Sequence, residues 1–319
     1  AAIYESRKVY MPDQVQPRGY AAEGPADTHH RTVLVSAFEG WNDAAQAATG
    51  ALRHLLKALE IASYEVGRIR SSSFFDYRST RPVICCVEGR RQILWPEVTF
   101  YTVDVSPSLT LLIEIGPEPS FSWIEFSQQT LRIADEYDIN EVITLGSMFN
   151  DVPHTRQLPL FEADSDDAAY AEDSYSGPIG IPSVLNITAA EQGYKTLSLW
   201  VSIPQYTGTD NCPAGILALI SRLGSYLNVE LPKGDLLHRT HEWALSADAL
   251  LAYNDDLKEY VRSLEKISDR EAAENSMGIH GDDIPQGLKE QLVNEAEEFL
   301  NSIDTDNRGT SGVPGKPEN

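Results

Sequence analysis

The chain has 319 residues, of which 42% are hydrophobic, and its formal net charge is −23. A chain of this size and composition can bury the core of one large or two small domains. The strongly acidic balance is unsuited to nucleic-acid phosphates and to an anionic membrane surface, so we expect neither as a partner.

The three cysteines, Cys85, Cys86 and Cys212, show no C-x-x-C spacing. We therefore expect no zinc site and no redox pair, and this usage is typical of a reducing cytoplasm. Residues 1–30 are polar and contain proline, so we interpret them as an N-terminal extension without a signal peptide. The sequence contains no run of about 20 apolar residues, so we predict no membrane span.

Residues 31–60 predict a strand, a turn and a helix. An apolar run is followed by "EGWND" (39–43) and then by an alanine-rich segment with helical spacing. Asn42 or Asp43 is suited to cap that helix, because a side-chain oxygen can accept an unpaired backbone N–H.

Further strands are predicted for residues 61–70, 82–89 and 97–105, with "RRQILWP" separating the last two. The continuously apolar "LTLLIEIG" (109–116) predicts a central strand covered on both faces. A helix should follow from Ser122, where Ser122 and Glu125 have the spacing of a capping box and Phe121 and Phe126 that of a hydrophobic staple.

The second half continues with a strand at 141–146, an acidic loop at 161–173, a strand at 195–206 and a helix at 210–227. Residues 240–267 predict one long helix with an apolar stripe at heptad spacing. The stripe has two interpretations, packing on its own domain or a subunit interface. Its interface candidates are Trp243, Leu250, Tyr253, Leu257, Tyr260 and Leu264.

Alternation of strands and helices predicts an α/β fold with three layers, α/β/α. The hairpin-like region 82–105 indicates that the central sheet is mixed rather than purely parallel. We place this domain at residues 31–267 and expect an acidic C-terminal extension at 268–319, with one amphipathic stretch at 284–299.

The motifs of well-known catalytic and nucleotide sites do not occur. The sequence contains no G-x-x-x-x-G-K-[ST], G-x-G-x-x-G, H-E-x-x-H or G-x-S-x-G. We therefore assign no catalytic residue, no metal and no cofactor.

Polar and aromatic side chains do gather where predicted strands end, which is where open α/β sheets bind ligands. If these segments converge, they form a mixed-charge pocket for a small polar ligand or for a peptide of a partner. The alternative is structural: Asp43 caps a helix, Asp76 and Arg78 pair across a turn, and Arg156 binds loop carbonyls. The binding candidates are Glu39, Trp41, Asn42, Asp43, Asp76, Tyr77, Arg78, Glu118, Trp123, His154 and Arg156.

The same segments carry a resemblance to a known family. The motifs are "GWNDA" (40–44), "DYRSTRP" (76–82), "LWPEVTF" (94–100), "EPSFSW" (118–123) and "DVPHTRQLPL" (151–160). In their order and spacing the chain resembles the bacterial, and particularly the actinobacterial, branch of the proteasome assembly chaperone 2 family.

This resemblance implies a phosphorylase/hydrolase-like α/β/α sheet and a homo-oligomer, for which we favour a trimer. Eukaryotic and archaeal relatives assist assembly of the 20S proteasome or bind to it, whereas bacterial members have no established reaction. We therefore expect a noncatalytic assembly or scaffold protein, with proteasome subunits as possible partners. The alternative is an enzyme for nucleosides or nucleotides on a phosphorylase-like fold. In that case Asp43, Asp76 or Glu118 would act as acid or base, and Arg78 or Arg156 would hold an anion.

Overall fold

A computed structural model describes residues 30–70, 72–164 and 177–276 of the chain. The expected N-terminal extension, most of the acidic loop and the amphipathic stretch at 284–299 lie outside these residues. Within them, none of the helices is long and apolar enough to cross a membrane.

A seven-stranded mixed sheet forms the centre of the molecule, in the order β2-β5-β6-β1-β7-β9-β8. The strands β6, β1, β7 and β9 are parallel, while β5 and β8 pair antiparallel with their neighbours. The strands of this sheet are β1 (Arg31–Glu39), β2 (Ser63–Ile69), β5 (Val98–Ser106), β6 (Leu109–Pro117), β7 (Ile139–Asn150), β8 (Leu160–Asp164) and β9 (Lys195–Pro204).

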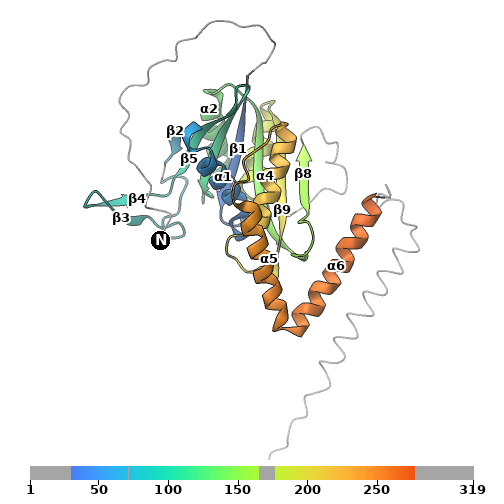
Figure 1. Ribbon diagram of the computed structural model, residues 1–319. Coiled ribbons are helices and arrows are strands. Elements are labelled where there is room, and N and C mark those ends of the chain that lie inside the picture. The colour runs from blue at the N-terminus through green and yellow to red at the C-terminus, as the bar shows by residue number, and fades with distance from the viewer. Residues whose placement is uncertain (1–29, 71, 165–176, 277–319) are drawn as a thin grey trace, which may run out of the picture.

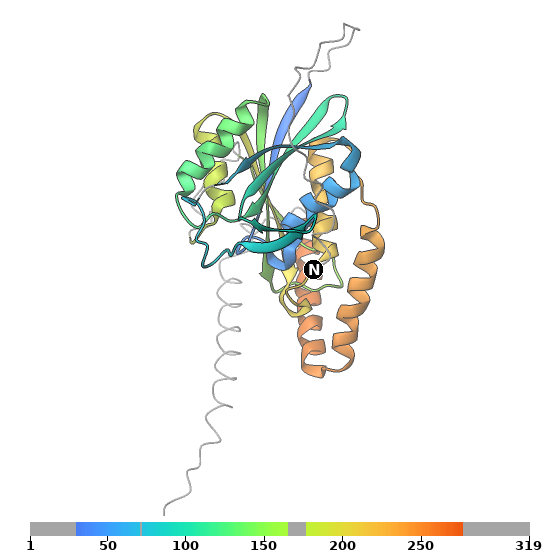
Figure 2. The ribbon, with the colours of Figure 1, turned by 90° about the vertical axis from the view of Figure 1, so that its left-hand side faces the viewer.

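Helices cover both faces of the sheet, so the expected three-layer α/β/α fold is confirmed (Figures 1 and 2). α1 and α4 pack on one face, with α5 against α4, and α2 and α3 pack on the other. The described helices are α1 (Ala47–Ala58), α2 (Trp123–Asp135), α3 (Ile181–Glu191), α4 (Pro213–Leu227), α5 (Leu236–Ala252) and α6 (Asp255–Ser276), with 3-10 turns at Ala44–Gln46, Glu60–Ala62 and Gln205–Thr207.

The strand β1 is largely apolar on both of its faces. Val33, Val35 and Ala37 pack toward α1 and α4, whereas Leu34 and Phe38 pack toward α2 and α3. A central parallel strand has both faces covered, so alternate positions need no polar side chain.

A small hairpin lies outside the main sheet. β3 (Val83–Val87) and β4 (Arg90–Leu94) pair with each other as a separate two-stranded sheet. "RRQIL" is therefore a strand, which corrects the prediction that it separates two strands. Residues 160–164 likewise form the edge strand β8, where we expected the acidic loop to begin at 161.

The predicted long helix at 240–267 is wrong, because the chain turns at Tyr253 and Asn254 and continues as α6. The side chain of Asn254 accepts the backbone N–H of Leu257 at 3.0 Å, and Asp255 and Asp256 occupy the first turn. These are the features of a helix start, so α5 and α6 form two arms of a V (Figure 1). α6 continues to Ser276, beyond the expected domain boundary at 267.

Candidate functional site

The four predicted binding segments follow strands that end at one edge of the sheet. β6, β1 and β7 are adjacent and parallel, and β2 runs in the same direction because it pairs antiparallel with β5, which pairs antiparallel with β6. We call this the carboxyl edge. The segments at 39–43, 75–82, 116–123 and 146–156 all leave the sheet there.

The turn after β1 is held by its backbone. Gly40 has φ +117°, a conformation that strongly favours glycine, and lets the chain turn sharply away from the sheet. The carbonyl of Asn42 accepts the N–H of Ser147 at 2.9 Å, and the Ser147 hydroxyl donates to the carbonyl of Ala44 at 2.9 Å. These bonds fix the turn against β7.

Asn42 and Glu118 join three segments at the carboxyl edge. The fully buried Asn42 donates from Nδ2 to Glu118 Oε1 at 2.7 Å, and the same oxygen accepts the N–H of Ile181 at 3.0 Å. Glu118 therefore closes the N-terminus of α3, where a carboxylate is favoured. Gly180 leaves the room that the Asn42 side chain occupies. We call Asn42, Glu118 and Ile181 the polar lock.

Asp43 supports α1 rather than facing solvent. Its carboxylate accepts the N–H of Thr49 at 3.0 Å and the Thr49 hydroxyl at 2.5 Å. The prediction that Asn42 or Asp43 is the N-cap is wrong, because Gln46 directly precedes α1, but the Asp43 carboxylate does bind an N–H of its first turn. Burial raises the pKa of Asp43, while the two bonds from Thr49 oppose that rise.

Glu39 also has its partners at this edge. Its carboxylate pairs with Arg53 of α1, and its carbonyl accepts the N–H of Glu118 at 3.0 Å. The turn after β1 and the loop after β6 are thereby connected through backbone as well as side chains.

The segment after β2 makes a turn of its own and packs on the loop that follows β6. Asp76 accepts the N–H of Arg78 at 2.9 Å, and its own N–H donates to the Ser120 hydroxyl at 3.0 Å. The Tyr77 ring lies 5.0 Å from that of Trp95. The predicted pairing of Asp76 with Arg78 therefore occurs through the backbone of Arg78.

The start of α2 corrects another expectation. Ser122 precedes the helix with a left-handed backbone (φ +55°) and makes no side-chain cap, so the predicted capping box is absent. Trp123 instead donates from its indole N–H to the carbonyl of Pro119 at 2.6 Å, which pins the loop after β6.

His154 and Arg156 face the helices α5 and α6 instead of the polar lock. Nδ1 of the buried His154 lies 2.8 Å from the Tyr206 hydroxyl, and Nε2 lies 3.0 Å from Asp248. Since the carboxylate only accepts, Nε2–H of His154 donates to Asp248. Arg156 forms a two-bond pair with Asp269 of α6. Burial raises the pKa of Tyr206 to about 12.

The apolar stripe of the interface candidates divides between the two helices. Leu264 is buried, Tyr260 donates its hydroxyl to Asp151 at 2.6 Å, and Trp243 packs edge-on to His154 at 6.2 Å. Leu250 and Tyr253, at the turn between α5 and α6, are exposed. Leu257 is half-buried.

Exposed apolar side chains flank the polar lock. Trp41 is 66% exposed, and it directly precedes Asn42. Phe121 and Ile124 follow Glu118, and Ile179 precedes Gly180; all three are exposed. We call these four residues the apolar rim. Sequence reasoning selected only Trp41 among them, because apolar residues in loops carry no signal that separates exposed from buried positions.

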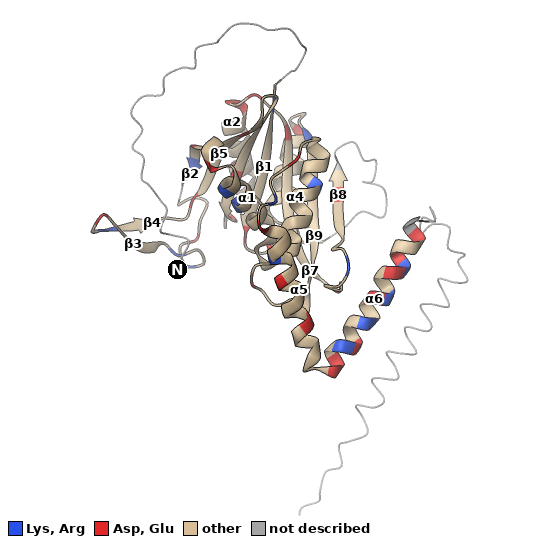
Figure 3. Ribbon diagram, viewed as in Figure 1, with Lys and Arg blue, Asp and Glu red and all other residues tan. Residues whose placement is uncertain are grey.

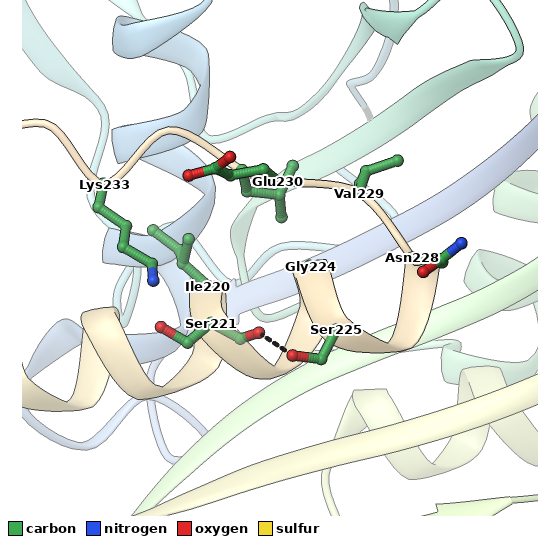
Figure 4. Close-up of a pocket in the computed structure, with 9 residues that line it drawn as sticks. Ile220, Ser221, Gly224, Ser225, Asn228, Val229, Glu230 and Lys233 are labelled. Atoms are coloured by element: carbon green, nitrogen blue, oxygen red, sulfur yellow. Dashed lines mark hydrogen bonds between the residues drawn. The ribbon is translucent and has the colours of Figure 1, made fainter.

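The described residues outline cavities elsewhere. One has a volume of about 490 Å³ and lies along α6, where Asp255, Lys258 and Arg262 are among the residues that line it. Another has a volume of about 390 Å³ and is bounded by the end of α4 and the segment that follows, including Ser221, Glu230 and Lys233 (Figure 4). Arg31, which begins β1, donates to the carbonyl of Leu227 at 2.6 Å, so the end of α4 lies at the edge opposite the polar lock. None of the predicted binding residues lines this cavity. Among the described residues, no group of three or more histidine, cysteine or acidic side chains is placed to hold a metal ion.

Comparison with known proteins gives one family. The model of the PAC2 family matches residues 37–251. A PAC2 family protein from Streptomyces avermitilis is 32% identical, with 72% of this chain and 99% of that chain covered and a TM-score of 0.66. No curated protein matches this chain.

Two further solved structures are similar. A proteasome-assembly chaperone homologue from Mycobacterium tuberculosis is 30% identical, with 72% of this chain and 99% of that one covered and a TM-score of 0.66. A protein from Corynebacterium glutamicum shares the fold at 22% identity and a TM-score of 0.69, with 79% of this chain and 96% of that one covered.

Proposed function

The chain belongs to the PAC2 family, and on that premise we propose that it is a noncatalytic assembly or scaffold protein whose carboxyl edge binds a protein partner. Its working form in this proposal is a cytoplasmic homo-oligomer, with a trimer favoured, and proteasome subunits are the first partners to test. The name of the M. tuberculosis relative supports that choice of partner.

The polar lock is the observation that supports binding over catalysis. A general acid or base has to reach a proton of the substrate, but Glu118 already accepts from Asn42 and Ile181, and Asp43 already accepts twice from Thr49. These bonds hold four chain segments at fixed positions. In this proposal the two carboxylates position the neighbouring exposed residues and do not react.

The exposed residues next to these carboxylates are those of the apolar rim. Trp41 and the other three residues of the apolar rim are presented to solvent on segments that the lock connects. Exposed apolar residues in such a group mark protein–protein sites, and a tryptophan on a rigid loop is a frequent centre of binding energy. Tyr77, Asp76 and Arg78 lie on the adjoining turn and would form the polar border of this surface.

The enzymatic alternative has no observation of its own in the described residues. Arg78 and Arg156 were its anion-binding candidates. Arg156 is paired with Asp269, Arg78 is exposed, and the cavity at α4 contains none of the predicted acids or bases. We therefore do not develop it.

The proposal predicts that Trp41→Ser with Phe121→Ser weakens partner binding while leaving the fold intact, because both side chains are largely exposed. The measurement is co-elution of the purified chain with proteasome subunits from the organism that encodes it, followed by titration. We expect at least about tenfold weaker binding, since central aromatic residues dominate interface energies.

The matched control is Tyr64→Ser, because Tyr64 is 56% exposed at the start of β2, on the opposite edge of the sheet. Absence of binding by the unmodified chain would refute the proposed partner. Equal binding by the double variant would refute the proposed surface.

A further inference from the structure

Glu118 has one carboxylate oxygen that the polar lock does not use. Asn42 and Ile181 both donate to Oε1, at 2.7 Å and 3.0 Å, whereas Oε2 accepts no hydrogen bond from the described residues. Glu118 is half-buried, and Oε2 is not one of the described polar atoms that are both buried and unpaired. Oε2 is therefore open to a donor from outside the chain.

The structural role of Glu118 does not require its charge. Both donors bind one oxygen, and the carbonyl of a glutamine side chain could accept the same two bonds. The N-terminus of α3 favours a negative charge, but its partial positive charge is too small to neutralise a carboxylate. The charge of Glu118 is thus left for an interaction that the chain does not make by itself.

Among the residues that the structure describes, no lysine, arginine or histidine forms an ion pair with Glu118. Arg53, at the same edge of the sheet, pairs with Glu39 instead. Other basic positions lie along α6 (Figure 3), and α6 packs on the loop after β7 rather than on the loop after β6. In a chain with a net charge of −23, the cation that matches Glu118 is therefore expected to belong to a partner.

Trp41 follows directly on the residue that lies beside this free oxygen. A side-chain carbon at Gly40 would be 3.6 Å from Oε2 of Glu118. The side chain of Trp41 is 66% exposed, and an indole face attracts a cation that lies within about 6 Å of its centre. A guanidinium group suits this pair of neighbours better than an ammonium group, because its N–H donors bind a carboxylate while its plane stacks on an aromatic ring.

We propose that the apolar rim receives an arginine side chain of the protein partner, whose guanidinium donates to Oε2 of Glu118 and lies against the indole of Trp41. This inference rests on the proposed function and names the chemistry of the contact at the same surface. Phe121, Ile124 and Ile179 exclude water from the ion pair when the partner is bound, which strengthens the attraction between the two charges.

Glu118→Gln separates the charge from the polar lock. The variant keeps an oxygen that can accept from Asn42 and Ile181, and it replaces Oε2 by an NH₂ group, which cannot accept from a guanidinium. The readout is the indole N–H signal of Trp41 in NMR spectra, assigned through its loss in Trp41→Phe. The probes are N-acetyl-arginine methylamide and the corresponding citrulline compound, which has nearly the same shape but no charge.

We expect the arginine probe to shift the Trp41 signal of the unmodified chain and to leave the signal of Trp243, in α5, unchanged. The citrulline probe should bind at least about tenfold more weakly, and Glu118→Gln should weaken binding of the arginine probe by at least about tenfold. Glu125→Gln is the matched control, because it removes an exposed carboxylate next to Ile124 and should leave the arginine response nearly unchanged.

An unshifted Trp41 signal, an equal response to citrulline, or an arginine response that survives Glu118→Gln would overturn the arginine contact. Equal weakening by Glu125→Gln would overturn it too, since the probe would then respond only to the general acidity of the surface. Co-elution with proteasome subunits is the separate readout. Subunits that bind without any arginine response would refute this inference alone, whereas an arginine response without bound subunits would refute only the proposed partner.

Discussion

Glu114 has an unusual environment for a carboxylate. It is fully buried in the central strand β6, where Ser36 and Thr130 each donate a hydroxyl to it at 2.6 Å. Burial raises the pKa of Glu114 from 4.5 to about 7, although both hydroxyls oppose the rise. The folded chain therefore holds a proton that the unfolded chain releases between these two pH values.

We predict that Glu114→Gln removes a pH dependence of stability. Because the folded pKa lies above the unfolded one, the native chain loses stability as pH rises from about 4.5 to about 7, whereas a neutral amide does not titrate. Between about pH 5 and about pH 8, the free energy of unfolding of the unmodified chain should fall by about 2–3 kcal/mol relative to that of the variant. Urea unfolding at several pH values measures the difference.

Glu125→Gln controls for removal of one carboxylate from an acidic chain, since Glu125 is exposed on α2. Parallel pH profiles for Glu114→Gln and the unmodified chain would contradict the assigned environment of Glu114.

At the scale of single residues, the sequence predicted the positions of polar groups better than their partners. It placed Asp43, Glu118 and Asp76 at strand ends correctly, because apolar runs locate strands. It could not predict that Glu118 closes α3, since α3 itself was not predicted and lies far along the chain. Pairings between distant segments depend on topology, which local spacing does not encode.

Among the elements, α5 and α6 depend on the loop after β7 for their position. His154 contacts η4 (Gln205–Thr207) through Tyr206 and α5 through Asp248, and its side chain is almost fully buried. Arg156 and Thr155 bind Asp269 and Glu265 of α6. His154 thus makes the buried contact with these helices, and Arg156 makes the exposed one.

We predict that His154→Ala loosens α5 and α6 without unfolding the sheet. The variant leaves the buried hydroxyl of Tyr206 with one partner fewer and creates a cavity, at a cost on the order of 2 kcal/mol. Hydrogen exchange of peptides from 236–276 should become faster, while peptides of β1 and β6 keep their protection.

Arg156→Ala is the comparison, because exposed ion pairs contribute little and its effect on the same peptides should be small. Unchanged exchange in α5 after His154→Ala, or an equal increase throughout the sheet, would show that His154 does not hold these helices.

The elements also show where a periodic pattern misleads. The heptad stripe continued in phase across Tyr253, so periodicity predicted one helix, while the Asn-Asp-Asp signal at 254–256 marked a new start. Similarly, Arg90 and Arg91 obscured β4, because a strand exposed on both faces lacks the usual alternation. The strongly buried strands and α4 were predictable since burial determines their composition.

For the whole molecule, the layers and the mixed sheet were predictable, and the surface was not. Continuous apolar strands require helices on both faces, and the hairpin-like segment before 105 indicated antiparallel pairing. Which apolar residues remain exposed depends on the final packing, and so the apolar rim and the bare hairpin emerged only from the structure.

For the whole molecule, we propose that the polar lock holds the apolar rim as a docking surface for protein subunits. This claim is tested by hydrogen exchange of the chain, alone and saturated with the proteasome subunits that co-elute with it. We predict slower exchange on binding in segments 40–43, 118–124 and 178–182, with the cavity segment 228–233 unaffected. Protection confined to other segments, or no protection in these three, would contradict the claim.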